Sequence, residues 1–393
     1  MRVALIAGPD AGHAYPIIAL GAELLRRGHA VRVGTGPDYE GEVERAGMEF
    51  FVLPLLAPQA EDVDIAHRLW TRAGQMAPPL ADMLRSWTPD VVVSDTLTAA
   101  GGFAAELLGL PWIEVIPHYL PDPDPALPPV GLGRLPSTRP WRRFDDASIR
   151  RRQEVSLAVG RAHRDRVRAS IGLSGTGRAA ARLVCNLPSL EHPRARWPGD
   201  VHLVGPLSWE PPLDPLPLPD GTEPLVAVTD STASTAASFL AEPAVRGLRN
   251  AGVRLVVTTS NPVTPWSRGC VIGKGPHGPL LDAAAVAVGP GGGGFLMKTM
   301  ARGVPMVVIP LMGDQRESAS RVTSAGAGRR LAPALLSPTT LRASVLRVLH
   351  DDRYAQAAVR LAGEAADLGP PRAAQVVEAV GAGETPVGRG PQR

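Results

Sequence analysis

The stretch that decides the fold is AAAVAVGPGGGGFLMKTMARGVPMVVIPLMGDQRESASR, residues 283–321. Its residues 285–288 are a short apolar run without helical period, which predicts a buried strand. The glycine-rich loop 289–294 follows, then a helical pattern over 295–302 and a second buried strand over 305–310. A glycine loop that opens a helix between two parallel strands directs backbone N–H groups toward one place, which suits an anion. A plain strand–helix turn is the alternative, because glycine-rich turns alone are weak signals.

The rest of the chain divides into two similar α/β halves. Residues 3–7, 13–27 and 30–33 predict a strand, a helix and a strand, an order that favours a parallel sheet with right-handed crossovers. The proline-dense residues 120–140 predict a binding loop or a mobile lid. Residues 150–171 predict a long charged helix. In chain order we expect an α/β domain at 1–205, a proline-rich linker at 206–224, a second α/β domain at 225–381 and a disordered tail at 382–393.

The composition limits the classes of function. A length of 393 residues suggests two domains, and a net charge of +3 with scattered basic residues gives no sign of a nucleic-acid partner. The two cysteines, Cys185 and Cys270, lack metal-ligand spacing and indicate buried thiols in a reducing cytoplasm. No apolar run reaches about 18 residues, so we expect no integral membrane segment. Pro9, Asp10 and His13 interrupt the first apolar run too early for a signal peptide.

With the residues that follow it, the glycine loop resembles the donor-nucleotide motif of family-one glycosyltransferases of the GT-B fold, in particular bacterial enzymes that glycosylate antibiotics. That motif reads His-Gly-Gly-x-Gly-Thr, a Glu on the next helix, then Gly-Val-Pro-x-Val-x-x-Pro and Asp-Gln. Residues 291–294 fit its glycines, residues 303–310 fit its next segment, and Asp314 and Gln315 fit its sugar-contacting pair. The resemblance implies two Rossmann-like domains whose parallel sheets face each other across a cleft.

Three positions of this chain differ from that motif. Pro290 replaces the pyrophosphate-binding His, Phe295 replaces the Thr, and Lys298 replaces the Glu that holds the ribose hydroxyls. The chain has only two lysines, Lys274 and Lys298, and both fall in donor-facing segments. Because an ammonium is a compact charge suited to phosphate, we expect Lys298 to contact the diphosphate or the ribose. Chance and a solvated helix face are the alternative account.

His13 and Asp95 are the candidate catalytic pair. Each follows or ends a predicted strand, and ligands of such sheets lie at the carboxyl ends of the strands. Residues 12–16, Gly-His-Ala-Tyr-Pro, fit the family's Gly-His-x-x-Pro segment, in which the His is the general base. An imidazole titrates near neutrality, and a carboxylate partner fixes its tautomer and stabilises the imidazolium. The alternative is that His13 begins a helix and Asp95 caps one.

The other expected site residues belong to a donor side and an acceptor side. Ser231 and Thr232 either bind phosphate or form an N-cap. Residues 275–281 fit the family segment that carries a base-stacking Trp, but they contain no Trp; Lys274 falls near its position, and we expect His277 to touch the base or the ribose. The full donor set is Ser231, Thr232, Lys274, His277, Gly291, Gly292, Gly293, Gly294, Lys298, Asp314 and Gln315. The expected acceptor set is Gly12, Trp70, Met76, His118 and Tyr119.

The resemblance implies an inverting, metal-independent glycosyltransferase. It would move a sugar from a thymidine or uridine diphosphate to a hydroxyl of a small apolar natural product, as a cytoplasmic monomer or homodimer without cofactor or metal. The three altered positions leave two alternatives open. One is a degenerate binding or accessory protein, and the other is a transferase that uses an unusual donor.

Overall fold

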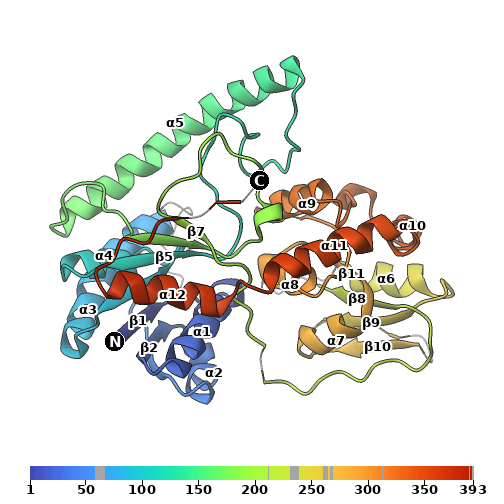
Figure 1. Ribbon diagram of the computed structural model, residues 1–393, viewed down its shortest axis with the longest axis horizontal. Helices are drawn as coiled ribbons and strands as arrows, with labels where there is room; N and C mark the ends of the chain where they lie inside the picture. Colours follow the sequence, from blue (N-terminus) through green and yellow to red (C-terminus); the bar gives the residue numbers. More distant parts are fainter. Residues whose placement is uncertain are drawn as a thin grey trace.

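Two α/β domains lie side by side, each built on one parallel sheet with helices on both faces (Figure 1). The computed structural model describes residues 1–57, 67–210, 212–230, 239–259, 264–265, 269–311, 313–388 and 390–391, with the backbone alone at 67 and 68. The predicted α/β class with two parallel sheets is confirmed. No helix within these ranges is both long and apolar enough to cross a membrane.

The first sheet has the strand order β3-β2-β1-β4-β5-β6-β7. Its central strands are buried on both faces: Val3 and Leu5 of β1 face one hydrophobic cluster, while Ala4 and Ile6 face another. Helices on both sides of a parallel sheet explain why these strands read as continuous apolar runs. The strands are β1 (Arg2–Ile6), β2 (Ala30–Thr35), β3 (Glu49–Val52), β4 (Val91–Asp95), β5 (Trp112–Ile116), β6 (Ala181–Val184) and β7 (Val201–Leu203).

The second sheet has the order β10-β9-β8-β11-β12-β13, again with parallel neighbours. Its strands are β8 (Leu225–Thr229), β9 (Arg254–Thr258), β10 (Cys270–Gly273), β11 (Ala284–Gly289), β12 (Met306–Val308) and β13 (Gly328–Arg330). The two strands predicted in the deciding stretch are β11 and β12, and they pair directly with each other.

The helices connect these strands. Those that follow strands of the first sheet are α1 (Ala11–Arg26), α2 (Glu40–Arg45), α3 (Arg72–Trp87), α4 (Ala100–Leu107) and α5 (Pro140–Ser170). Those that follow β8 are α6 (Ala241–Leu248), α7 (His277–Ala283), α8 (Gly293–Met300), α9 (Gln315–Ser324), α10 (Pro338–Leu349), α11 (Asp352–Ala365) and α12 (Pro370–Gly381). Short 3₁₀ turns cover Pro37–Tyr39, Pro188–Leu190 and Pro333–Leu335, and a π-helical turn precedes α3 at His67–Thr71.

The last helix corrects the expected domain division. We assigned all of 225–381 to the second domain, but α12 packs on the first, with Ala373, Val377 and Val380 in the core cluster of β1 and α1 (Figure 1). The spacing of the apolar residues in α12 predicts that one face of the helix is buried, but it does not tell which sheet covers that face. The chain therefore crosses between the domains twice, and the crossings touch at Gly369, next to residues 204–205.

The tail is more ordered than expected, and the proline-rich linker packs on the second domain. In the tail, the Gly388 N–H donates a hydrogen bond of 2.8 Å to Gly199 O, so the predicted disorder does not hold for residues 382–388. The linker lies along the second domain, where Leu216 sits so close to Gly273 of β10 that a Cβ there would come within 2.7 Å of it. A backbone hydrogen bond thus holds the tail, and the side chain of Leu216 packs the linker against β10.

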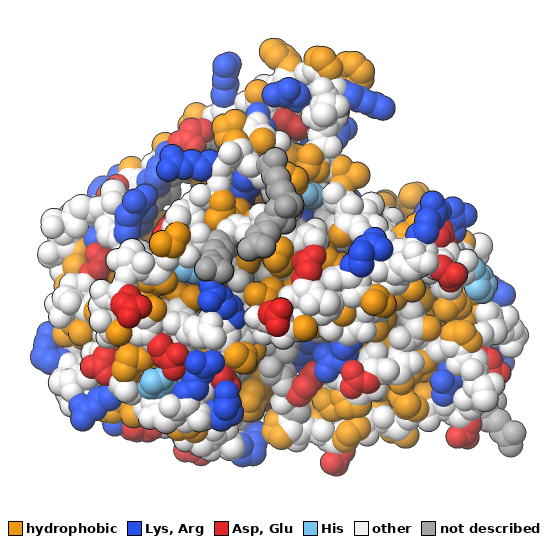
Figure 2. Space-filling view, viewed as in Figure 1, with side chains coloured by type: hydrophobic (Ala, Val, Ile, Leu, Met, Phe, Trp, Pro, Cys, Tyr) orange, Lys and Arg blue, Asp and Glu red, His pale blue; other side chains and the backbone are white. Residues whose placement is uncertain are grey.

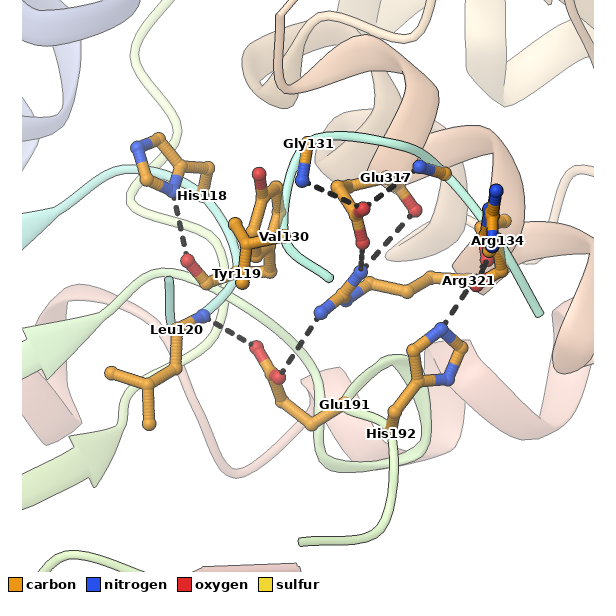
Figure 3. A network of polar contacts seen from close by, with 12 residues as sticks. His118, Tyr119, Leu120, Val130, Gly131, Arg134, Glu191, His192, Glu317 and Arg321 are labelled. Atoms are coloured by element: carbon orange, nitrogen blue, oxygen red, sulfur yellow. Dashed lines mark hydrogen bonds and ion pairs between the residues drawn. The ribbon is translucent and has the colours of Figure 1, made fainter. Parts of the chain in front are cut away.

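The proline-dense loop after β5 is hydrogen-bonded to α9 of the second domain (Figure 3). Glu317 of α9 accepts hydrogen bonds from the N–H groups of Gly131 (3.0 Å) and Gly133 (2.8 Å). Its other oxygen accepts one of 2.6 Å from Arg321, whose guanidinium also lies 4.1 Å over the ring of Tyr119. Both partners of this ion pair are buried. The structure thus holds this loop against α9, which argues against the predicted mobile lid, and a role of the loop in ligand binding stays a prediction.

Candidate active site

His13 and Asp95 meet at the carboxyl edge of the first sheet. Asp95 ends β4, His13 lies in the first turn of α1 directly after β1, and these two strands are parallel neighbours. His13 Nδ1 lies 2.6 Å from Asp95 Oδ1. The other carboxylate oxygen accepts the N–H of Leu97 (3.1 Å) and the hydroxyl of Thr98 (3.2 Å). The carboxylate is thus fixed at both oxygens, and it fixes the imidazole in turn.

The pKa of His13 is raised above its ordinary value of 6.5. Burial alone lowers it, but the attraction and the hydrogen bond of Asp95 outweigh the burial. Smaller contributions come from Asp10 and from Asp314 of the second domain. Since Nδ1 is bound to the carboxylate, Nε2 is the nitrogen that remains for a substrate proton. This arrangement suits a general base.

A cavity of about 110 Å³ opens beside His13. Most of its lining is apolar, and the predicted acceptor residue Met76 is part of it. The lining residues that were not predicted come from the connections after three strands and from the starts of α3 and α4: Gly8, Pro9, Asp10, Leu56, Leu69, Arg72, Ala73, Leu97, Thr98, Ala99 and Ala100. Leu97 and Thr98 could have been predicted to lie at the site, because they closely follow the candidate residue Asp95 in the sequence. The cavity can hold a small apolar group next to the base.

Two predicted acceptor residues lie beside this cavity without lining it. Trp70 stacks on Phe103 with ring centroids 6.3 Å apart, and Gly12 is exposed in the first turn of α1. Trp70 therefore supports the wall formed by α3 and α4. A direct contact of either residue with an acceptor stays a prediction.

His118 and Tyr119 follow β5 and have different surroundings. His118 Nδ1–H donates to Tyr119 O at 2.8 Å, and burial lowers the pKa of His118 despite the nearby charge of Asp314. A neutral imidazole beside the catalytic pair agrees with the predicted role near the acceptor. Tyr119 instead lies under Arg321 in the interdomain network, where burial raises its pKa (Figure 3).

The glycine loop brings the second domain to this edge. Gly291 has φ +91° and faces Val308, so only glycine fits there. A Cβ on Gly293 would lie 2.8 Å from the carbonyl oxygen of Pro117, directly before His118. Gly292 and Gly294 face open space. The loop that opens α8 therefore touches the first domain directly before His118, with open space at the Cβ positions of Gly292 and Gly294.

Asp314 and Gln315 lie at the start of α9. Gln315 is buried, and its side-chain oxygen accepts the N–H of Leu311 at 2.9 Å, which holds the turn before the helix. Asp314 is only partly buried and lies near enough to His13 to raise its pKa. Asp314 of the second domain thus acts electrostatically on His13 of the first domain, and a contact of Asp314 and Gln315 with a sugar stays a prediction.

Lys298 binds the linker rather than an open donor site. Its ammonium donates to Trp209 O at 2.6 Å and pairs with Glu210 at 3.0 Å, and the side chain is buried. Burial lowers the pKa of Lys298. Glu210 also accepts the N–H groups of His277 (3.1 Å) and Gly278 (3.0 Å). Nothing in the pattern of the linker predicted a role for the carboxylate of Glu210.

The other predicted donor residues are spread around the same edge. His277 Nε2 lies 3.1 Å from Thr258 Oγ1, its ring packs edge-on against Phe295, and burial lowers its pKa to about 4. Lys274 is exposed directly after β10. Ser231 and Thr232 lie outside the described residues. The neutral imidazole of His277 is well placed for a hydrogen bond at the carboxyl ends of β8 and β9.

Two facing parallel α/β domains, a glycine loop at a helix start and a histidine–aspartate pair across the gap define a glycosyltransferase of the GT-B class. Comparison with known proteins agrees. Residues 270–382 match the family model "Erythromycin biosynthesis protein CIII-like, C-terminal domain". The chain belongs to the family-one glycosyltransferases, and it is an enzyme.

Individual relatives cover nearly the whole chain. The 4'-demethylrebeccamycin synthase of Lentzea aerocolonigenes is 30% identical over 92% of this chain and 95% of its own. The solved structure of the glycotransferase of kitacinnamycin is 23% identical, with a TM-score of 0.76 over 96% of this chain and 98% of its own. That of the glycosyltransferase VinC in complex with dTDP is 21% identical, with a TM-score of 0.70 over 97% of this chain and 100% of its own.

Proposed function

We propose that the protein is an inverting glycosyltransferase that works without a metal. Its donor is a thymidine or uridine diphosphate sugar, and its acceptor is a hydroxyl of a small apolar natural product. The observation that carries the proposal is the 2.6 Å contact of His13 with Asp95 beside a largely apolar cavity. The relative that acts as 4'-demethylrebeccamycin synthase and the relative solved with dTDP support the classes of acceptor and donor.

The chemistry is a single displacement. The acceptor oxygen attacks the anomeric carbon as the bond from that carbon to the diphosphate oxygen breaks, and the diphosphate leaves with the bonding electrons. His13 Nε2 takes the proton of the acceptor hydroxyl, and Asp95 stabilises the imidazolium that results. Because attack and departure occur on opposite faces, the anomeric configuration inverts.

The donor is held in a way that differs from the family motif. Pro290 offers no N–H, so the amides of 291–294 at the start of α8 supply the contacts to the diphosphate. The pair of Lys298 and Glu210 is neutral overall and adds no net charge there. A direct contact between Lys298 and the phosphate requires this pair to open. In the closed pair, the carboxylate of Glu210, one-third exposed, is the group that a ribose hydroxyl reaches.

The test is the substitution His13→Ala, with His350→Ala on the exposed end of α10 as the control. Loss of a general base typically costs on the order of 10²–10⁴ in rate, so transfer should fall by that factor while nucleotide binding stays intact. The control should behave as wild type. Nuclear magnetic resonance of the product should show an inverted anomeric centre, and chelators should not slow the reaction. Wild-type kcat in His13→Ala, or a retained configuration, contradicts the proposal.

A further inference from the structure

The long helix α5 carries an unusual charge. Its 31 residues include nine arginines (Arg142, Arg143, Arg150, Arg151, Arg152, Arg161, Arg164, Arg166 and Arg168) and four acidic residues (Asp145, Asp146, Glu154 and Asp165). Nine minus four gives a net charge of +5, which exceeds the +3 of the whole chain. We expected scattered basic residues from the sequence, whereas this helix alone carries nine arginines. Asp146 and Arg168 are the buried residues of the helix.

One face of α5 is used by the fold. Arg150 donates to Leu127 O at 2.6 Å, and Gln153 donates to Val130 O at 2.8 Å. Further along the same face, Arg168 pairs with Glu106 of α4 at 2.6 Å. These contacts fix α5 to the proline-dense loop and to the first domain, and they determine which face points outward.

The outward face carries an apolar stripe. Trp141, Phe144, Val155 and Val159 are 65%, 79%, 68% and 65% exposed. With Ser148 and Arg152 between them, they recur every three or four residues, so they lie along one side of the helix. Figure 2 shows hydrophobic groups beside basic ones at the projecting end of the molecule, where α5 begins in Figure 1. We call these four residues the α5 stripe.

We propose that the α5 stripe docks on an anionic lipid surface. A helix with aromatic and aliphatic groups on one side and many arginines around them is the type that lies in a membrane interface. Tryptophan favours the headgroup level, and the exposed arginines of the helix, among them Arg151, Arg152 and Arg166, complement anionic lipids. A second copy of the chain would bring the same positive charge against it. A nucleic acid would leave the valines of the stripe in water.

Docking would place the acceptor cavity near the membrane. α5 packs on α3, where Gly74 approaches Val167 so closely that no Cβ fits, and α3 supplies the cavity residues Ala73 and Met76. An apolar acceptor that partitions into lipid would then reach the enzyme from the membrane surface. This goes beyond the proposed transfer reaction, which does not depend on it.

Vesicle flotation tests the proposal. The full chain is mixed with vesicles of phosphatidylcholine alone, or of equal parts phosphatidylcholine and phosphatidylglycerol. The variant Trp141→Ser/Phe144→Ser is compared with Leu335→Ser/Val359→Ser, which removes equally exposed apolar groups (64% and 62%) elsewhere. We expect wild type and control to float with the anionic vesicles only. The stripe variant should bind roughly tenfold more weakly for each aromatic removed, and added salt should weaken binding.

Each other outcome overturns the proposal. Wild type that does not float, that floats equally with both kinds of vesicle, or that floats no better than the stripe variant rules out an anionic lipid surface. A wild-type dimer that the stripe variant turns into a monomer makes the stripe an interface between copies instead. Transfer to a water-soluble acceptor should be unchanged in the stripe variant, which shows that it is folded and keeps this test separate from that of the reaction.

Discussion

The substitution Glu317→Gln should weaken the attachment of the proline-dense loop to α9. The change keeps the shape of the side chain but removes the charge that pairs with Arg321. The new amide then directs N–H groups at the guanidinium of Arg321. The second carboxylate near this guanidinium, that of Glu191, is 3.9 Å away. The hydrogen bonds from Gly131 and Gly133 remain but lose their charge assistance.

The size of the effect follows from burial. Glu317 and Arg321 are 7% and 5% exposed, and removing one partner of a buried ion pair costs about 3–5 kcal/mol. When the loop lifts from α9, water reaches the guanidinium, so opening relieves this cost. The free energy of opening should therefore fall by about 3 kcal/mol or more, which raises the open population roughly a hundredfold.

Limited proteolysis measures this population. The loop holds a trypsin site after Arg134, whereas the bond after Arg139 precedes a proline and resists cleavage. When opening is fast relative to cleavage, the nicking rate follows the open population. The control is Glu242→Gln, because Glu242 and Arg246 have the same i,i+4 spacing but are 72% and 68% exposed, and such a pair contributes less than about 1 kcal/mol. Equal nicking rates for Glu317→Gln and wild type refute the reasoning.

Three further predictions concern the site itself. The rate of transfer should fall toward acid pH with a midpoint above 6.5, because the pKa of His13 is raised and only its neutral form accepts a proton; a midpoint below that value in a pH–rate profile contradicts this. Gly293→Ala should lower stability by about 1–3 kcal/mol, since a Cβ meets a carbonyl of the other domain, whereas Gly294→Ala should not; thermal unfolding compares the two. Lys298→Met should weaken nucleoside diphosphate binding, because it leaves the carboxylate of Glu210 without its ammonium partner at the donor side. Adding Glu210→Gln should restore part of the loss, and calorimetry on the single and double variants decides: a double variant that binds no better than Lys298→Met contradicts this.

Features formed by neighbouring strands were predictable from the sequence. The apolar runs and glycine loop of 283–321 identified β11, α8 and β12, because their pattern is local. His13 and Asp95 were found together because a parallel sheet gathers the carboxyl ends of its strands at one edge. The start of α5 was predicted at 150 rather than at Pro140, although proline at the first helical position was a usable signal.

Features that depend on distant contacts were not predictable. Lys298 matched a donor position in the family motif, but its partner Glu210 lies in a linker with no periodic pattern. The interdomain pairing of Glu317 with the loop around Gly131 depends on tertiary packing that neither segment encodes alone. The apolar face of α12 showed that it is buried, but not by which sheet.

The return of α12 to the first domain sets the order in which the protein can be completed during synthesis. The ribosome finishes every strand of the first sheet by Leu203, yet Ala373, Val377 and Val380 of that domain's core emerge only at the other end of the chain. Until then the surface of β4 and β6 that α12 covers is exposed. The domain that is made first is thus completed last, after the donor domain has been translated, and an interrupted chain leaves an apolar surface open to aggregation.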